Sequence, residues 1–186
     1  MEPLGIALLG CGTVGGGVAK LLLQQAERMT RRAGRPLQLK RVVVRDTHRR
    51  RAVPIPADLV TTDARLALID PKVDIVVELI GGTTLARDYV LQALAAGKNV
   101  VTANKALLAE HGVEVFEAAR HYERAVCFEA SVAGGVPIIG AIAQSMSANQ
   151  IPGIPGIPNG PSNFILTQMT GPRPQYHAAP AEAPQP

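Results

Sequence analysis

A glycine-rich turn follows the first apolar segment of the chain and has the spacing of a phosphate-binding loop. It lies directly after the apolar residues 4–9 and opens a stretch with helical spacing. In such a turn the first glycine permits a tight bend, the second lets the backbone approach a pyrophosphate, and the third lets the helix pack close to the strand. Free amide groups at the helix start attract the anion. The motif predicts a dinucleotide site, against the alternative of a glycine turn that binds nothing. Its residues are Gly10, Cys11, Gly12, Thr13, Val14 and Gly15.

The end of the second apolar segment bears on which dinucleotide binds. Val42–Val44 is followed by Arg45 and Asp46. An acidic residue at this strand end holds the 2′-hydroxyl of NAD, whereas an arginine neutralises the 2′-phosphate of NADP. Arg45 comes first, and His48 and the three arginines at 49–51 add positive charge. The sequence therefore favours NADP, while Asp46 leaves NAD open. A plain solvated loop over 49–51 is compatible with either cofactor.

Composition and charge limit the kinds of partner. The chain has 186 residues, of which 47% are hydrophobic and 3% aromatic, and its formal net charge is +4. Much of the basic excess lies at 28–41 and 45–51. Basic patches bind nucleic acid in some proteins, but no aromatic residues are interleaved with these, and a solvated helix end and loop explain them as well. We expect no nucleic-acid partner.

The cysteines and histidines predict neither a disulfide framework nor a metal centre. Cys11 and Cys127 lie far apart, and the four histidines lack the spacing of ligands. Met1 leads almost directly into the first strand without a signal-type segment, and no apolar run reaches membrane-spanning length. We expect no membrane partner and a cytoplasmic location.

Hydrophobic periodicity predicts alternating strands and helices. Short apolar runs predict buried strands at 4–9, 39–44, 73–79, 99–102 and 125–128. Helical spacing predicts helices at 14–32, 63–69, 84–96, 104–110, 113–123 and 137–146. Gly34 and Gly97 are expected to end helices, and Thr83 or Thr84 and Asn104 to cap them. Strands that are apolar throughout and separated by helices predict an α/β fold, a doubly wound parallel sheet of the Rossmann type.

The character of the chain changes after residue 148. We expect one domain over 1–148, followed by a segment over 149–171 with prolines spaced three apart. Proline has no amide hydrogen, so this segment cannot be a central strand and is predicted to be extended and irregular, with a helical turn or two over 163–169. The Pro/Ala-rich tail at 172–186 is predicted to be disordered.

Further segments resemble a known family. Residues 101–109 read Val-Thr-Ala-Asn-Lys-Ala-Leu-Leu-Ala, and residues 129–139 read Glu-Ala-Ser-Val-Ala-Gly-Gly-Val-Pro-Ile-Ile. Residues 159–166 read Asn-Gly-Pro-Ser-Asn-Phe-Ile-Leu. Together with the glycine turn, and in this order, they resemble the signature segments of homoserine dehydrogenases. The match runs to about residue 169.

The resemblance implies an enzyme that interconverts L-homoserine and L-aspartate 4-semialdehyde with NADP or NAD, in threonine, methionine and isoleucine synthesis. Lys105 matches the family's lysine between cofactor and substrate, and is thereby implied to be both catalytic and cofactor-binding. Thr83 is implied to lie near the ribose and nicotinamide. A flexible cation at a helix start suits a phosphate or a developing alkoxide, while an exposed lysine without a role is the alternative.

The resemblance also implies a monovalent cation, usually sodium. The matching residues supply one carboxylate, from Glu129, and three backbone carbonyl oxygens. A hard cation prefers such oxygen ligands. A strand-to-helix turn without an ion is the alternative. The carbonyl oxygens belong to Val132, Gly134 and Val136.

The chain departs from the family pattern towards its C-terminal end. The family's substrate domain carries an acidic residue for the amino group of homoserine and a lysine that donates a proton. No lysine follows Lys105, and the only carboxylate beyond Glu129 is Glu182. We expect 149–171 to be the remnant of an α+β substrate and dimerisation domain. Turnover and the family's homo-oligomer are then expected to be impaired. The alternative is a catalytically inactive NAD(P)-binding module with a regulatory or binding role.

Overall fold

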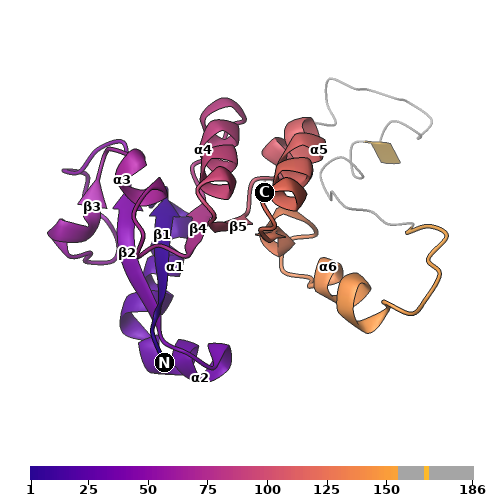
Figure 1. Ribbon diagram of the computed structural model, residues 1–186, viewed down its shortest axis with the longest axis horizontal. Helices are drawn as coiled ribbons and strands as arrows, with labels where there is room; N and C mark the ends of the chain where they lie inside the picture. Colours follow the sequence, from indigo (N-terminus) through magenta and orange to yellow (C-terminus); the bar gives the residue numbers. More distant parts are fainter. Residues whose placement is uncertain (155–165, 168–186) are drawn as a thin grey trace. The chain divides into compact units, whose positions relative to one another are not determined.

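Parallel strands form a single six-stranded sheet in the computed structural model, which describes residues 1–154 and 166–167 (Figure 1). The strands are β1 (Leu4–Leu9), β2 (Leu37–Val43), β3 (Val60–Thr61), β4 (Ile75–Glu78), β5 (Asn99–Thr102) and β6 (Val126–Cys127). Their order across the sheet is β3-β2-β1-β4-β5-β6. The chain thus begins in the middle of the sheet, runs to one edge and then returns to build the other. This is the doubly wound Rossmann arrangement that the sequence predicts.

Helices cover both faces of the sheet. They are α1 (Thr13–Gln24), α2 (Ala26–Ala33), α3 (Arg65–Leu68), α4 (Thr84–Ala95) and α5 (Lys105–His121). The short helix α6 (Ile138–Gly140) contacts the turn that follows β6 instead. Short 3-10 turns lie at Ala57–Leu59 and Glu129–Ser131, and a π-helical turn lies at Ala141–Ser145. Alternate residues of β1 point to opposite faces. Ile6 and Leu8 share a core with α1, while Ala7 and Leu9 share the other core with α3, α4 and α5.

The three central strands end level with one another. Leu9 of β1 pairs with Glu78 of β4, and Glu78 pairs with Thr102 of β5. Because the strands are parallel, the loops that follow them meet at the same edge of the sheet. Ligands of doubly wound sheets bind at this carboxyl edge.

Two helix predictions were wrong. The helix predicted over 14–32 is broken at Gln25, whose φ of −125° and ψ of 29° lie outside the helical region, so α1 and α2 are separate. The two helices predicted over 104–123 are one, α5, because Gly112 stays helical within it. The buried residues Leu107, Val115 and Ala119 of α5 lie on both sides of Gly112 in the core that α5 shares with the sheet. A helix held by such packing on both sides tolerates one interior glycine.

Smaller corrections concern short elements. The sequence did not predict β3, a strand of two residues that exists through its pairing with Val42 and Val43. Thr83 precedes α4 but its side chain makes no capping hydrogen bond. The helix predicted over 137–146 is shorter: α6 has three residues and continues into the π-helical turn. The expected ends at Gly34 and Gly97 are confirmed, with φ of 72° and 76°.

The chain divides into two compact units, Met1–Ile142 and Ala143–Pro186, and the whole sheet belongs to the first. Residues 151–154 of the second unit are exposed and have no helix or strand. Most of the predicted remnant at 149–171 and all of the tail at 172–186 lie outside the described residues. Among the helices that the structure describes, none has both the length and the apolar character needed to span a bilayer.

Candidate cofactor-binding site

The glycine turn after β1 has the three properties that its motif requires. Gly10 has a φ of 98°, and a Cβ atom there would lie 2.6 Å from the carbonyl oxygen of Leu79. A Cβ atom on the buried Gly15 would lie 2.3 Å from the carbonyl oxygen of Gly10. Gly12 is exposed, and a Cβ atom there would meet no atom within 4 Å. The first and third glycines are therefore required by packing within the protein, whereas the second leaves an open backbone surface.

The start of α1 offers unsatisfied amide groups beside that surface. Gly12 is the N-cap residue of α1, no side chain caps the helix, and its first turn contains no acidic residue. The amide groups of a first helical turn have no partner within the helix, and the helix dipole makes this end attractive to anions. Open backbone at an uncapped helix start is the environment in which proteins bind diphosphates, so the residues present fit a dinucleotide.

A groove of about 320 Å³ lies against the glycine turn and is bordered by two cations, Lys20 and Arg51. Cys11, Gly12 and Thr13 also line this groove. The groove therefore combines open backbone with positive charge next to the expected diphosphate position.

Arg51 is a residue whose role the sequence did not reveal. Its guanidinium donates to the backbone carbonyl oxygens of Asp46, Thr47 and Arg49, and thereby folds the loop after β2 around itself. Arg51 is half-buried, whereas the neighbouring Arg49 and Arg50 are exposed. The plain solvated-loop interpretation of 49–51 therefore holds for two of these arginines and is wrong for Arg51. No local signal distinguishes the three, because the burial of Arg51 depends on contact with the glycine turn.

The thiol of Cys11 lies within reach of that guanidinium. Burial raises the pKa of the Cys11 thiol, and the charge and hydrogen bond of Arg51 offset part of this rise. Both Cys11 and Cys127 are free cysteines. Within the described part of the chain, no group of three or more His, Cys, Asp or Glu side chains is placed to hold a metal ion.

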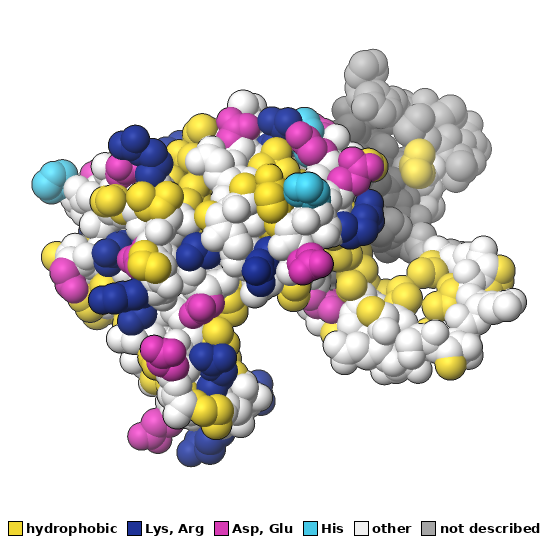
Figure 2. Space-filling model, viewed as in Figure 1, with side chains coloured by type: hydrophobic (Ala, Val, Ile, Leu, Met, Phe, Trp, Pro, Cys, Tyr) yellow, Lys and Arg dark blue, Asp and Glu magenta, His cyan; other side chains and the backbone are white. Residues whose placement is uncertain are grey.

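The residues that were expected to distinguish NADP from NAD lie in the same loop. Arg45 is exposed and follows Val44, beyond the end of β2. Asp46 uses its side chain locally, because its Oδ1 accepts a hydrogen bond of 2.8 Å from the amide of His48. Figure 2 shows basic and acidic side chains interspersed over the face in view, with no single basic patch there.

A buried polar network joins the loops after β4 and β5. The carboxylate of Glu78 accepts hydrogen bonds from the amides of Ile80 and Gly81, at 2.9 and 3.3 Å. Its other oxygen accepts one from the hydroxyl of Thr102, at 2.6 Å. The Thr102 hydroxyl in turn accepts from the amide of Asn104, at 3.0 Å. The sequence analysis did not single out Glu78, and it included Thr102 only as part of the segment 101–109, because the two residues stand on different strands and share no motif spacing.

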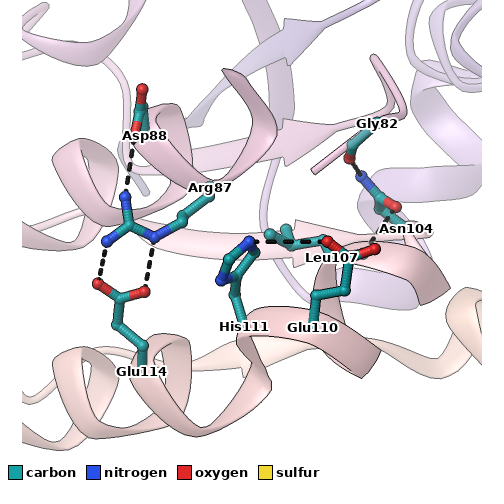
Figure 3. A network of polar contacts seen from close by, with 8 residues as sticks. All are labelled: Gly82, Arg87, Asp88, Asn104, Leu107, Glu110, His111 and Glu114. Carbon is teal, nitrogen blue, oxygen red and sulfur yellow. Dashed lines mark hydrogen bonds and ion pairs between the residues drawn. The ribbon is translucent and has the colours of Figure 1, made fainter. Parts of the chain in front are cut away.

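Asn104 connects the two loops directly and confirms the predicted helix cap. Its Oδ1 accepts from the amide of Leu107 at 3.1 Å, which caps α5. Its Nδ2 donates to the carbonyl oxygen of Gly82 at 2.7 Å, as Figure 3 shows. The exposed Lys105 is the first residue of α5, and the half-buried Thr83 follows Gly82. Both therefore lie at the carboxyl edge of the sheet, on adjoining loops.

Helices α4 and α5 are also joined by an ion pair on their outer side. The guanidinium of Arg87 contacts both carboxylate oxygens of Glu114 and one oxygen of Asp88 (Figure 3). The hydrogen bond and charge of Arg87 lower the pKa of Glu114, and the charge of His111 adds to the effect.

Asp63 and Arg65 form a similar, more exposed pair at the start of α3, in which Arg65 lowers the pKa of Asp63.

The carboxylate expected to hold a cation is bonded to backbone amides. The two oxygens of Glu129 accept hydrogen bonds from the amides of Ile139 and Gly140, at 3.0 and 2.8 Å. These bonds tie both ends of the intervening turn together. Ala133 and Gly134 both have positive φ, 53° and 59°. A carboxylate and backbone carbonyl oxygens are the kinds of ligand that a hard cation prefers.

Comparison with known proteins places this site in a family. A parallel sheet of this strand order, with a glycine turn at its first strand–helix junction, defines a dinucleotide-binding domain. Residues 10–129 match the family model for the NAD-binding domain of homoserine dehydrogenase, and residues 137–185 match a second model described as homoserine dehydrogenase. The chain belongs to the homoserine dehydrogenase family.

Individual relatives agree with this assignment. Homoserine dehydrogenase from Pseudomonas aeruginosa is 46% identical over 172 residues, which are 91% of this chain and 38% of the relative. That from Bacillus subtilis is 39% identical over 98% of this chain and 42% of the relative. The crystal structure of a homoserine dehydrogenase from Thiobacillus denitrificans has a TM-score of 0.77 and 47% identity, and the match covers 90% of this chain and 39% of that one. The chain thus spans about two fifths of the length of these relatives.

Proposed function

We propose that the chain forms the cofactor-binding part of an NADP- or NAD-dependent homoserine dehydrogenase, which interconverts L-homoserine and L-aspartate 4-semialdehyde. The observation that carries this proposal is the glycine turn, in which Gly12 presents open backbone at the uncapped start of α1. Family membership supports a dehydrogenase rather than a binding module without activity. The cofactor, when bound, supplies or accepts the hydride.

The protein's own residues bind and orient the reactants in this proposal. The turn from Gly10 to Gly15 holds the diphosphate through backbone amides. Thr83 lies near the ribose and nicotinamide, and Lys105 places an ammonium group near the substrate oxygen. A cation there stabilises negative charge that develops on the oxygen during hydride transfer.

Calorimetric titration of the chain with NADPH and NADH tests cofactor binding. We expect a heat of binding and a raised melting temperature for at least one of the two. Gly12→Ala is expected to abolish the heat without lowering the melting temperature of the unliganded protein. A folded sample that binds neither cofactor contradicts the proposal. An assay of NADPH formation from homoserine and NADP, with Lys105→Ala as the comparison, then tests turnover.

We further propose that NADP is the preferred cofactor. Arg45 at the end of β2 and the cations that border the groove, Lys20 and Arg51, favour an additional phosphate. Replacing Arg45 by alanine is expected to raise the Kd of NADPH about tenfold and to leave that of NADH within a factor of about two, since a hydrogen bond to a charged group contributes about 1.5–3 kcal/mol. Equal effects on both Kd values, or none, contradict this preference.

A monovalent cation at Glu129 completes the proposal, with the carbonyl oxygens of Val132, Gly134 and Val136 as its other ligands. Because the carboxylate already accepts two amide hydrogen bonds, the ion would share it with the backbone. Melting temperatures in sodium chloride and in choline chloride at equal ionic strength separate specific binding from screening. We expect a higher value in sodium chloride, and no difference for Glu129→Gln.

A further inference from the structure

We infer that Glu78 is a positioning residue for the nicotinamide side of the cofactor site, acting through the loops that carry Thr83 and Lys105. The inference rests on the proposed function and deepens it, because it divides the site into a half that depends on Glu78 and a half that does not.

The burial of Glu78 is the first observation. Its exposed fraction is 0%, and within the described part of the chain it is the one buried carboxylate. Removing a carboxylate from water is costly unless hydrogen bonds replace the lost hydration. Its donors are two backbone amides and one hydroxyl, all neutral. An apolar side chain at this strand end would avoid the cost of removing a carboxylate from water. We therefore infer that the contribution of the carboxylate is to fix the positions of the groups that donate hydrogen bonds to it.

Those groups belong to a connected set of loops. The amides of Ile80 and Gly81 shape the turn after β4, in which Gly81 and Gly82 have φ of 74° and 70°. The Thr102 hydroxyl donates a hydrogen bond to Glu78 and accepts one from the amide of Asn104, and so links the two loops.

Two further hydrogen bonds connect these loops. The side-chain amide of Asn104 donates to the carbonyl oxygen of Gly82 in the loop after β4. Ser131, from the loop after β6, donates to the carbonyl oxygen of Thr102 at 3.0 Å.

Thr83 and Lys105 are the next residues along these loops. Each is one residue from an atom of the network, Gly82 and Asn104 respectively. Their relative position is therefore set by hydrogen bonds that lead back to Glu78. The glycine turn after β1 packs against Leu79 and Ile80 of the loop after β4, but the amide of Gly10 donates to the carbonyl oxygen of Val43 on the other side. Glu78 makes no hydrogen bond to the glycine turn, so we expect it to act mainly on the β4–β5 side of the site and less on the diphosphate side.

The test compares two ligands that share the adenosine diphosphate half: NADH, and ADP-ribose, which lacks nicotinamide. The variant is Glu78→Gln, which keeps the side-chain volume but turns one acceptor into a donor. Since the Thr102 hydroxyl already accepts a hydrogen bond from Asn104, an amide donor at residue 78 takes away the acceptor for its proton. The matched control is Glu117→Gln, the same substitution at an exposed position of α5.

We expect Glu78→Gln to raise the Kd of NADH about tenfold and that of ADP-ribose less than twofold, and to reduce the fluorescence change of the reduced nicotinamide on binding. Glu117→Gln is expected to leave all three measurements unchanged. Thr102→Ser keeps the hydroxyl and should behave as the wild type. Thr102→Val removes it and should behave as Glu78→Gln. If the Glu78 variant does not fold, the comparison of these two Thr102 variants tests the inference.

The outcomes separate the inference from the proposed function. A folded wild-type protein that binds neither NADPH nor NADH overturns the proposed function. A protein that binds NADH and ADP-ribose, but whose Glu78 and Thr102→Val variants lose affinity for both ligands by the same factor, or for neither, overturns the inference alone. So does a wild type that binds NADH no more tightly than ADP-ribose.

Discussion

The loop after β1 and the loops after β4 and β5 lie at the same edge of the sheet but are built in opposite ways. The first is shaped by missing side chains: Gly10 and Gly15 leave no space for a Cβ atom, and Gly12 leaves its surroundings open. The others are shaped by side chains that hydrogen-bond to backbone, with Glu78, Thr102 and Asn104 as the connecting residues.

This difference determines how each region tolerates change. In a site built from glycine backbone, a substitution is destabilising when the added side chain collides with neighbouring atoms. Packing depends on Gly10 and Gly15, whereas the approach of the ligand depends on Gly12. A side-chain network fails through unsatisfied polar atoms, which weaken the fold and displace the loops together. The predictions below separate these two modes of failure.

The largest effect is expected in the glycine turn. Gly15→Ala places a Cβ atom 2.3 Å from the carbonyl oxygen of Gly10, so the helix must shift, and we expect a loss of about 3 kcal/mol in the free energy of unfolding. Gly12→Ala meets nothing within 4 Å and should lose cofactor binding alone. Urea unfolding and calorimetry measure the two. Gly17→Ala, in α1 with no atom near its added Cβ, is the control and should be neutral or stabilising by up to about 1 kcal/mol. Equal unfolding midpoints for Gly15→Ala and Gly17→Ala would show that the turn can relax.

An intermediate effect is expected in the network. Thr102→Val keeps the shape of the side chain but removes the hydroxyl that donates to Glu78 and accepts from Asn104. Leaving buried polar groups unpaired costs about 1–3 kcal/mol, so we expect a loss of about 2 kcal/mol in urea unfolding. Thr62→Val, at an exposed position, should stay within about 0.5 kcal/mol of the wild type. If both variants unfold at the same urea concentration, the network does not stabilise this edge.

The smallest effect is expected at the ion pair between α4 and α5, whose side chains are 35% and 43% exposed. Arg87 lowers the pKa of Glu114, so the native state binds a proton there less readily than the unfolded chain. The stabilisation is therefore present above the ordinary carboxyl range, about pH 4.3, and is lost as the pH falls through the lower native pKa. We expect the difference in urea midpoint between the wild type and Arg87→Met to shrink between pH 7 and pH 3. Arg120→Met, exposed near the end of α5, should show no comparable change with pH. If the difference in urea midpoint between the wild type and Arg87→Met grows as the pH falls, the ion pair does not stabilise the protein as expected.

Much of the fold follows from local sequence. The apolar run Leu4–Leu9 and the glycine spacing after it specify β1, the turn and the start of α1, because steric and packing demands act between near neighbours. The same holds for the helix ends at Gly34 and Gly97 and for the cap of α5 by Asn104, where the interacting groups are within three residues. The resemblance to homoserine dehydrogenases also rests on contiguous segments and could be read without coordinates.

Only the tertiary structure decided which distant groups meet. The bond between Glu78 and Thr102 spans 24 positions and exists because β4 and β5 pair in a register that sets these residues side by side. The burial of Arg51 and the existence of β3 likewise depend on segments brought together by the sheet. Sequence patterns report the steric and hydrophobic preferences of neighbours along the chain, whereas these contacts depend on strand register and loop packing, which only the assembled sheet fixes.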